Sequence, residues 1–386
     1  DAIQSYLMNY YLFFDTEVNK RTMIALRGKD PIKTHINTIL DYSLYWLISF
    51  KDYYEYTGDA SFLVEMYPKM KTMMDFILER RNEKGFLQGL PGDWVFIDWA
   101  DISKEGEISF EQILFEQSLA AMQLSAKLAG ESEDQKLYDK LGKELKSSIE
   151  SVFWDPEKEQ VLYRRVNDTL SDEVSRHANI FSILGNYFDD KKREKIKENI
   201  LLNPEITALR TPYMKFYELA ALCETGEHEF VIRDILNYWG GMLDLGATSF
   251  WEEYNPEKSG LEHYSMYGFP FNKSLCHSWG ASPIYLFGKY FLGVKPLAPG
   301  YSEYEVQPNL GGLDFIQGIV PTAKGNVQVF MDAKTIEVTS EIENGILRFE
   351  STKPPKCKQG VIKRNSSNEY EIELKANVKY KVTGSW

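Results

Sequence analysis

Carboxylates next to tryptophans are the feature of this sequence that most suggests chemistry. They stand in three pairs, Asp93-Trp94, Asp98-Trp99 and Trp251-Glu252. Hydrolysis of a glycosidic bond needs two carboxyl groups in different environments, one as an acid and one as a base or nucleophile. A tryptophan packed against a carboxyl group desolvates it, and the indole also offers a flat apolar face to a sugar ring. The sequence has no Gly-x-Ser-x-Gly elbow, phosphate-binding loop or dinucleotide fingerprint, so these pairs favour sugar chemistry.

The individual candidates differ in how strongly they suggest catalysis. Asp98 and Asp101 lie in a loop, where an aspartate is more often a turn former than a catalyst. Glu252 adjoins a second acid, Glu253, and we expect one of the two to face inward and the other to face solvent. His277 alone is more typical of a helix cap or a core residue. It becomes a ligand for a sugar hydroxyl if the helix expected after it points its N-terminus at the same cavity.

Charge and composition exclude several classes of function. The 386 residues include 44 Lys+Arg and 57 Asp+Glu, and the net charge of −13 argues against a nucleic-acid or anionic-membrane partner. No segment is apolar and long enough for a transmembrane helix. The three cysteines are too few for a disulfide framework, and five scattered histidines argue against a metal site. Few cysteines slightly favour a cytoplasmic location, but a periplasmic or secreted one stays open, and the oligomeric state is not indicated.

Aromatic residues are abundant, with 22 Phe, 24 Tyr and 8 Trp. Aromatic rings pack well on the C–H faces of sugars. A large helical core would also use many aromatics, so composition alone does not decide between the two interpretations.

Helical periodicity dominates residues 1 to about 295. The pattern predicts helices near 1–14, 16–27, 34–56, 60–80, 109–129, 132–153, 171–185, 189–199, 211–224, 226–239 and 276–294. Thr57-Gly58-Asp59 should end one helix and begin the next, and Ser171-Asp172-Glu173 should open another. Turns of very different length suggest helices paired around an axis. The two long connections, 81–108 and 240–275, are rich in aromatics, and we expect them to be walls of a site.

The pattern changes at about residue 296. Period-two segments follow, such as those at 304–307, 327–330, 335–338 and 370–374, with turns such as Asn344-Gly345 between strand-like runs. The pattern of this tail predicts an antiparallel β-sandwich, which we expect to be a packing and support domain without chemistry of its own. We therefore expect two domains, a helical domain over 1–296 and a β domain over 297–386.

Several strings resemble the bacterial α-L-rhamnosidases of glycoside hydrolase family 78. The strings lie at 211–218, 238–244, 246–252, 274–280, 299–301 and 308–313, and Gly-Ala-Thr-Ser-Phe-Trp-Glu at 246–252 is fairly specific. The resemblance covers nearly the whole chain. It implies a mainly α fold, an (α/α)6 barrel with its first helix missing, followed by a C-terminal antiparallel β-sandwich. It also implies an inverting mechanism without a cofactor and the release of terminal α-L-rhamnose from a rhamnose-containing oligosaccharide or glycoside.

The resemblance assigns roles to individual residues. Glu252 corresponds to the general base that activates water, with Trp251 beside it. His277 corresponds to a substrate-contacting histidine. Asp93 and Trp94 lie in a loop whose tryptophan lines the sugar subsite. Asp41-Tyr42 corresponds more loosely to another site-lining position.

The family's general acid lies in a motif that ends in Gly-Asp, and Asp1 resembles that last aspartate. The resemblance therefore implies that Asp1 holds a sugar hydroxyl and that the general acid lies upstream of it. The chain begins with Asp rather than Met, and eleven helices are expected where such a barrel needs twelve. Loss of general-acid assistance costs about 10²–10⁴-fold in rate. We expect this chain alone to be a weak or inactive hydrolase.

Two other interpretations stay open. One is an inverting helical-barrel glycosidase for another 6-deoxy or neutral sugar, which a screen of aryl glycosides would distinguish. The other is a non-catalytic carbohydrate-binding protein that keeps the barrel. Binding of L-rhamnose without turnover, even with the upstream segment restored, would favour this last interpretation.

Overall fold

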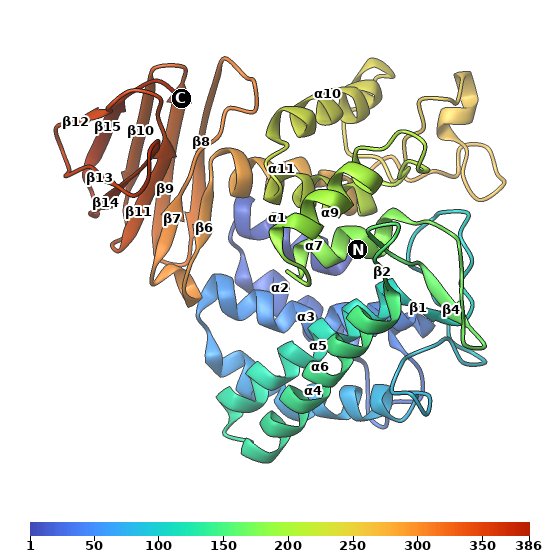
Figure 1. Ribbon diagram of the computed structural model, residues 1–386. Coiled ribbons are helices and arrows are strands. Elements are labelled where there is room, and N and C mark those ends of the chain that lie inside the picture. The colour runs from blue at the N-terminus through green and yellow to red at the C-terminus, as the bar shows by residue number, and fades with distance from the viewer. The chain divides into compact units, whose positions relative to one another are not determined.

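Two units make up the structure, a computed structural model that describes residues 1–386. Unit 1 comprises Asp1–Thr16, Tyr53–Asp59 and Gly226–Trp386. Unit 2 comprises Glu17–Asp52 and Ala60–Thr225. The colours of Figure 1 follow the chain through both units. No helix is long and apolar enough to cross a membrane.

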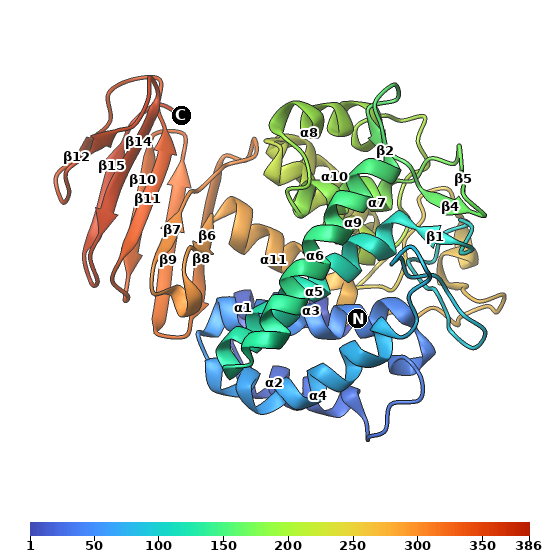
Figure 2. The ribbon, with the colours of Figure 1, turned by 60° about the horizontal axis from the view of Figure 1, so that its bottom comes forward.

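Helices build most of unit 2. They are α2 (Thr16–Arg27), most of α3 (Leu40–Thr57), α4 (Ala60–Leu78), α5 (Ser109–Ala129), α6 (Ser132–Phe153), α7 (Arg176–Leu184), α8 (Asp190–Ile196) and α9 (Pro212–Glu224). Helix α5 packs against α4, α6 and α7, and α4, α5 and α6 can be followed in Figure 2. Its side chains Phe110, Ile113, Leu114 and Met122 are fully buried, because apolar residues recur every three to four positions.

Short strands interrupt these helices where the sequence pattern predicts none. Strands β1 (Glu107–Ile108), β4 (Arg164–Val166) and β5 (Thr169–Leu170) form one small sheet, and β2 (Trp154–Asp155) pairs with β3 (Gln160–Val161). The prediction that a helix starts at Ser171 is wrong. Helix α7 begins at Arg176, because the side chain of Ser175 caps it by accepting a hydrogen bond from His177 N, and Glu173 lies before the helix in an ion pair with Arg164 at 3.1 Å.

The junction of α3 and α4 lies where the sequence predicts it. Helix α3 ends at Thr57, Gly58 adopts φ +71°, and α4 begins at Ala60. A positive φ favours glycine, which has no Cβ to clash. The predicted stop at Thr57-Gly58-Asp59 is confirmed.

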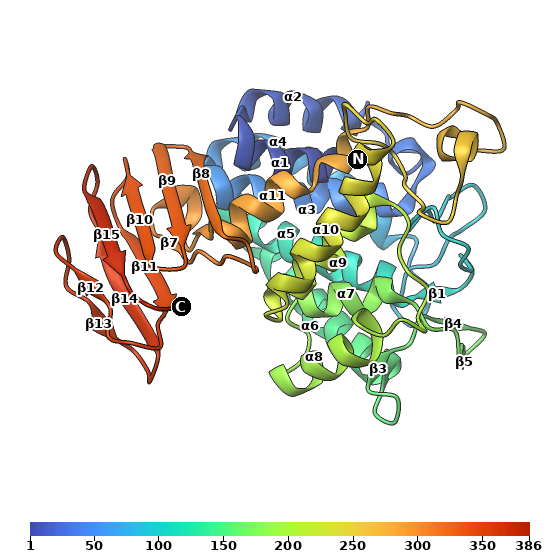
Figure 3. The same cartoon turned by 90° about the horizontal axis from the view of Figure 1, so that it is seen from above.

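Unit 1 contains helices α1 (Ala2–Leu12), α10 (His228–Asp244) and α11 (Pro283–Leu286). Helix α1 packs against α11, beside which it lies in Figure 3. Helix α10 continues past its predicted end at 239. Gly240 and Gly241 lie inside it, and a Cβ on Gly241 would come within 2.2 Å of the Tyr254 hydroxyl. This glycine therefore admits a neighbouring ring and does not end the helix.

The predicted helix over 276–294 is wrong in its first part. Ser278–Ala281 form a single 3₁₀ turn, α11 spans only Pro283–Leu286, and Phe287–Phe291 continue as a wider turn. The backbone of His277 donates to Phe250 O at 2.8 Å, and Trp279 Nε1 donates to Glu252 O at 2.9 Å. These bonds tie 277–279 to the segment that carries Glu252, which leaves no place for a regular helix.

Two five-stranded sheets follow in unit 1, in the orders β12-β15-β10-β9-β8 and β13-β14-β11-β7-β6 (left in Figure 1). The strands are β6 (Val294–Pro296), β7 (Tyr304–Val306), β8 (Phe315–Thr322), β9 (Gly325–Asp332), β10 (Thr335–Ser340), β11 (Gly345–Glu350), β12 (Lys356–Cys357), β13 (Lys363–Arg364), β14 (Glu369–Leu374) and β15 (Lys379–Thr383). Burial alternates along the long strands, as a sandwich requires. All pairs are antiparallel except β7 with β11, which are parallel. The domain boundary at 296/297 stays a prediction.

Candidate active site

Glu252 lies in a buried, hydrogen-bonded position in unit 1. It belongs to an irregular segment between α10 and the 3₁₀ turn at 278, drawn in gold (Figures 1 and 3). The residue is 4% exposed. Ser274 N donates to Oε2 at 3.1 Å, and the hydroxyl of Tyr267 donates to Oε1. Each carboxyl oxygen thus has a donor, and the two hydrogen bonds orient the group.

Glu253, the adjacent acid, is held in ion pairs. Its Oε2 lies 2.6 Å from Lys273 Nζ and 3.0 Å from Lys258 Nζ. Burial lowers the pKa of Lys273, and the Glu253 carboxylate opposes this shift. Both acids are buried, so the prediction that one of them faces solvent is wrong. Glu253 contributes to the support of the segment, whereas Glu252 forms no ion pair with a lysine and acts on Lys273 only through its charge.

His277 lies between Glu252 and Asp1. Its Nδ1 lies 3.8 Å from Glu252 Oε2, and its Nε2 lies 3.3 Å from Asp1 Oδ1. Burial lowers the pKa of His277, and the Glu252 carboxylate partly offsets this effect. The structure thus brings together three predicted site residues of unit 1, although His277 is positioned by the bonded segment at 277–279 and not by a helix.

Trp251 is only 3% exposed, and its ring lies 5.6 Å from that of Tyr264. This packing supports the backbone next to Glu252. A contact between Trp251 and substrate stays a prediction.

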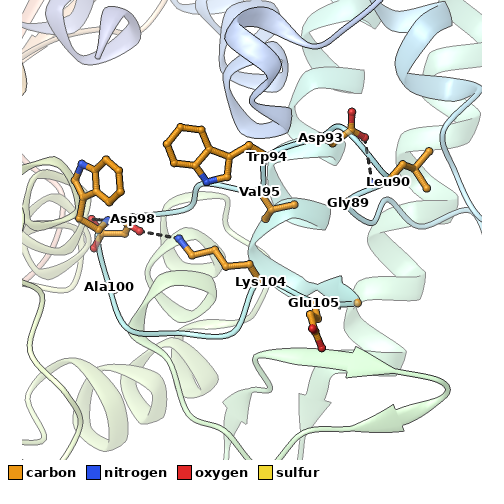
Figure 4. A pocket seen from close by; sticks show the side chains of 11 residues that line it. Gly89, Leu90, Asp93, Trp94, Val95, Asp98, Ala100, Lys104 and Glu105 are labelled. Atoms are coloured by element: carbon orange, nitrogen blue, oxygen red, sulfur yellow. Dashed lines mark hydrogen bonds between the residues drawn. The ribbon is translucent and has the colours of Figure 1, made fainter. Parts of the chain in front are cut away.

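The predicted residues of unit 2, Asp93 and Trp94, lie on a loop that lines a pocket. The pocket has a volume of about 680 Å³ and is formed by residues of 89–106 (Figure 4). Trp94 is 43% exposed and Trp99 is 37% exposed, and their ring centroids are 5.8 Å apart. Two partly exposed indoles in a pocket can pack on the apolar face of a ligand.

Asp93 and Asp98 are both engaged within the protein. Asp93 Oδ2 accepts a hydrogen bond from Leu90 N at 3.2 Å, which is drawn in Figure 4, and lies 3.8 Å from His35 Nε2. Burial lowers the pKa of His35 to about 4. Asp98 accepts from the Thr211 hydroxyl at 2.6 Å and is buried. Asp98 also lies 3.3 Å from His177 Nε2, and its interpretation as a turn former stays a prediction, as does substrate binding by Asp93.

Asp41 positions the tryptophan-bearing loop, a role that sequence reasoning missed. Its two oxygens accept hydrogen bonds from Phe96 N at 3.1 Å and Ile97 N at 2.5 Å. Burial raises the pKa of Asp41, and these two donors oppose the shift. The two elements lie 55 residues apart, and the only sequence signal was the loose correspondence of Asp41-Tyr42 to a site-lining position.

Two further titratable groups, Glu111 and Lys104, interact electrostatically with Asp41. Neither oxygen of Glu111 has a hydrogen-bond partner, and burial together with the Asp41 carboxylate raises its pKa well above the usual value. Burial lowers the pKa of Lys104, which donates to Asp98 O at 2.8 Å. No group of three or more metal-ligating side chains is found that could hold a metal ion.

Comparison with known proteins defines the class of this domain. A family model for a six-hairpin glycosidase domain matches residues 31–291, more than half of the chain. The chain belongs to the family that this model describes, the bacterial α-L-rhamnosidase six-hairpin glycosidase domains. The predicted fold class, helical hairpins of an α/α barrel followed by a C-terminal β domain, is confirmed.

Individual relatives agree with this assignment. An α-L-rhamnosidase of Alteromonas sp. strain LOR is 26% identical over 314 residues, which are 76% of this chain and 31% of that protein. The crystal structure of a family GH78 rhamnosidase from Bacillus sp. GL1 has a TM-score of 0.75 at 25% identity, over 86% of this chain and 36% of that one. A rhamnosidase from Klebsiella oxytoca with rhamnose bound has the same fold, with a TM-score of 0.62 at 24% identity. The match covers 75% of this chain and 57% of that one. The chain therefore spans about a third of the length of the first two.

Proposed function

We propose that this chain is the base-bearing, sugar-binding part of an inverting glycoside hydrolase that releases terminal α-L-rhamnose from a glycoside or oligosaccharide. The observation that carries the proposal is the buried carboxyl of Glu252, which has a donor on each oxygen and forms no ion pair with a lysine. Such a carboxylate can take a proton from water. Membership of the α-L-rhamnosidase family supports rhamnose as the sugar.

In this mechanism Glu252 removes a proton from the water that attacks the anomeric carbon. His277 and Asp1 hold sugar hydroxyls. A neutral imidazole can both donate and accept a hydrogen bond, and a carboxylate accepts one. The lowered pKa of His277 keeps the ring neutral at pH 7. Positive charge develops on the sugar ring in the transition state, and nearby carboxylates stabilise it.

Trp94 and Trp99 provide an apolar face for the sugar in this proposal. Sugar rings have C–H faces that pack on indoles. The exposure of both rings in the pocket of unit 2 supports this role. Asp93 holds the turn that carries Trp94 through the bond between Oδ2 and Leu90 N, and its Oδ1 is the oxygen that we assign to a sugar hydroxyl.

We also propose that the general acid is not among residues 1–386. Glu253 is ill suited to donate a proton, because two lysines stabilise its charged form. The correspondence of Asp1 to the end of the family's acid motif supports an upstream acid.

The test compares hydrolysis of p-nitrophenyl α-L-rhamnoside by this chain and by a longer form that extends about a hundred residues upstream of Asp1. We expect activity in the longer form, with the inverted anomer as the first product by NMR. Rhamnose binding without turnover in both forms would contradict the proposal and favour a binding protein.

A further inference from the structure

Tyr267 occupies the tip of a tight hairpin in the segment that carries Glu252. Met266 and Phe269 pair through two backbone hydrogen bonds of 3.1 and 3.0 Å. Between them, Tyr267 has φ +56° and Gly268 has φ +79°. Two-residue hairpin turns with positive φ at both central positions strongly favour Asn-Gly. A tyrosine at the first position is therefore an outlier.

The positive φ of Tyr267 is unfavourable for a tyrosine, and the turn itself does not require this residue type. A left-handed conformation brings Cβ close to the following carbonyl oxygen, and a bulky residue tolerates it poorly. Asparagine would relieve this strain. Such outliers persist where the surrounding structure imposes them, and they point to function when another observation agrees.

That second observation is the contact made by the phenol. The Tyr267 residue is 46% exposed, yet its hydroxyl donates to Oε1 of Glu252, which is 4% exposed. The hairpin thus directs a polar atom from the surface to the buried carboxyl. The backbone N–H of Ser274 already donates to the other oxygen, so the phenol is the one side-chain donor of the two.

We propose that Tyr267 is a positioning residue for Glu252, with its phenol fixing the carboxyl orientation and favouring the charged form that acts as a base. This inference rests on the proposed function of Glu252 as the general base. A hydrogen bond to an ionised carboxylate is stronger than one between neutral groups, and it stabilises the charged state. The surrounding structure therefore maintains an unfavourable turn conformation, and this conformation holds the phenol against the base.

The kinetic test uses the longer form and three variants. We expect Tyr267→Phe to lower kcat about ten- to a hundredfold, as loss of a hydrogen bond to a charged group implies, with KM changed less than twofold. The acid limb of the kcat/KM profile should move to higher pH. Tyr264→Phe is the matched control, because that hydroxyl meets only a backbone carbonyl, Leu245 O, at 3.4 Å. Its kinetics should match those of the unchanged protein.

Tyr267→Asn separates positioning from structure. Asparagine suits the turn, so we expect an equal or higher Tm together with the same loss of kcat. A lower Tm with a proportionate loss of activity would overturn the proposal, as would unchanged kinetics in Tyr267→Phe.

A titration that does not depend on enzymatic activity tests the role of Tyr267 separately from the proposed function of Glu252. The side-chain carboxyl of Glu252, labelled with ¹³C and assigned with Glu252→Gln, should protonate at a higher pH in Tyr267→Phe than in the unchanged 386-residue chain. An unmoved titration overturns the role of Tyr267. Absence of rhamnosidase activity in the longer form contradicts the proposed function, while the titration still decides the role of Tyr267.

Discussion

His277 Nδ1 lies 3.8 Å from Glu252 Oε2 in a setting where burial and charge act in opposite directions on the imidazole. The carboxylate favours the imidazolium, whereas burial disfavours it. Burial is the larger effect, and the pKa of His277 lies below its usual value of 6.5. The distance is short enough for a change at one residue to be measured at the other.

Glu252→Gln should lower the pKa of His277 further. The substitution keeps the shape of the side chain and removes the charge that favours the imidazolium. An NMR titration of the His277 ring protons in the 386-residue chain measures this shift. Glu229→Gln, on α10, serves as a charge-matched control. A His277 pKa that stays constant or rises in Glu252→Gln would show that the two groups do not interact.

Trp94→Ala should weaken rhamnose binding. Loss of one aromatic packing face is worth about 0.5–1.5 kcal/mol, or about two- to tenfold in affinity. Titration calorimetry with L-rhamnose measures the effect. Phe315→Ala, which removes an exposed aromatic ring from β8, is the control and should bind as the unchanged chain does. Equal affinities in all three proteins would remove Trp94 from the site.

Asp41→Ala should destabilise the chain. The substitution leaves the buried N–H groups of Phe96 and Ile97 without their acceptor, at a cost of roughly 1–3 kcal/mol for each group. Urea unfolding monitored by tryptophan fluorescence measures the change. Asp101→Ala, at an exposed position of the same loop, should stay within about 0.5 kcal/mol. Similar midpoints for both variants would contradict the role of Asp41 as the anchor of the loop.

Glu111→Gln should change the pH dependence of stability. The pKa of Glu111 is raised well above the ordinary value of about 4.3, so above that pH the folded chain keeps a proton that the unfolded chain loses. Its contribution to stability is therefore present at low pH and is lost as pH rises toward the folded pKa. The variant should gain stability relative to the unchanged chain as pH rises above that ordinary value. Glu65→Gln, at an exposed site on α4, should show no such trend, and parallel curves for Glu111→Gln and the unchanged chain would refute this prediction.

Local sequence patterns predict most of the long helices and the strands of the C-terminal sheets, but long-range contacts determine the site and the short strands of unit 2. The α3–α4 junction and the β strands follow from nearest-neighbour preferences, such as the positive φ at Gly58. Asp41 acts on a loop 55 residues away, and the helix predicted from 276 is replaced by bonds to 250–252, so periodicity could not reveal either.

Some site residues could be predicted from the sequence and others could not. Glu252 and His277 are candidates from their residue types and neighbours, and the family resemblance assigns their roles; the structure places His277 Nδ1 3.8 Å from Glu252 Oε2. Tyr267 was missed because its backbone conformation runs against local preference. Tyrosine is unfavourable at this turn position, so the contact between Tyr267 and Glu252 could be found only from the three-dimensional structure.

The most direct test of the central claim is hydrolysis of p-nitrophenyl α-L-rhamnoside by the longer form carrying Glu252→Ala, with and without azide. We expect a loss of about 10²–10⁴-fold, because no group removes the proton from water. Azide needs no base, so it should restore turnover and give a rhamnosyl azide of inverted configuration. Activity of the variant equal to that of the unchanged protein would contradict the assignment of Glu252 as the general base.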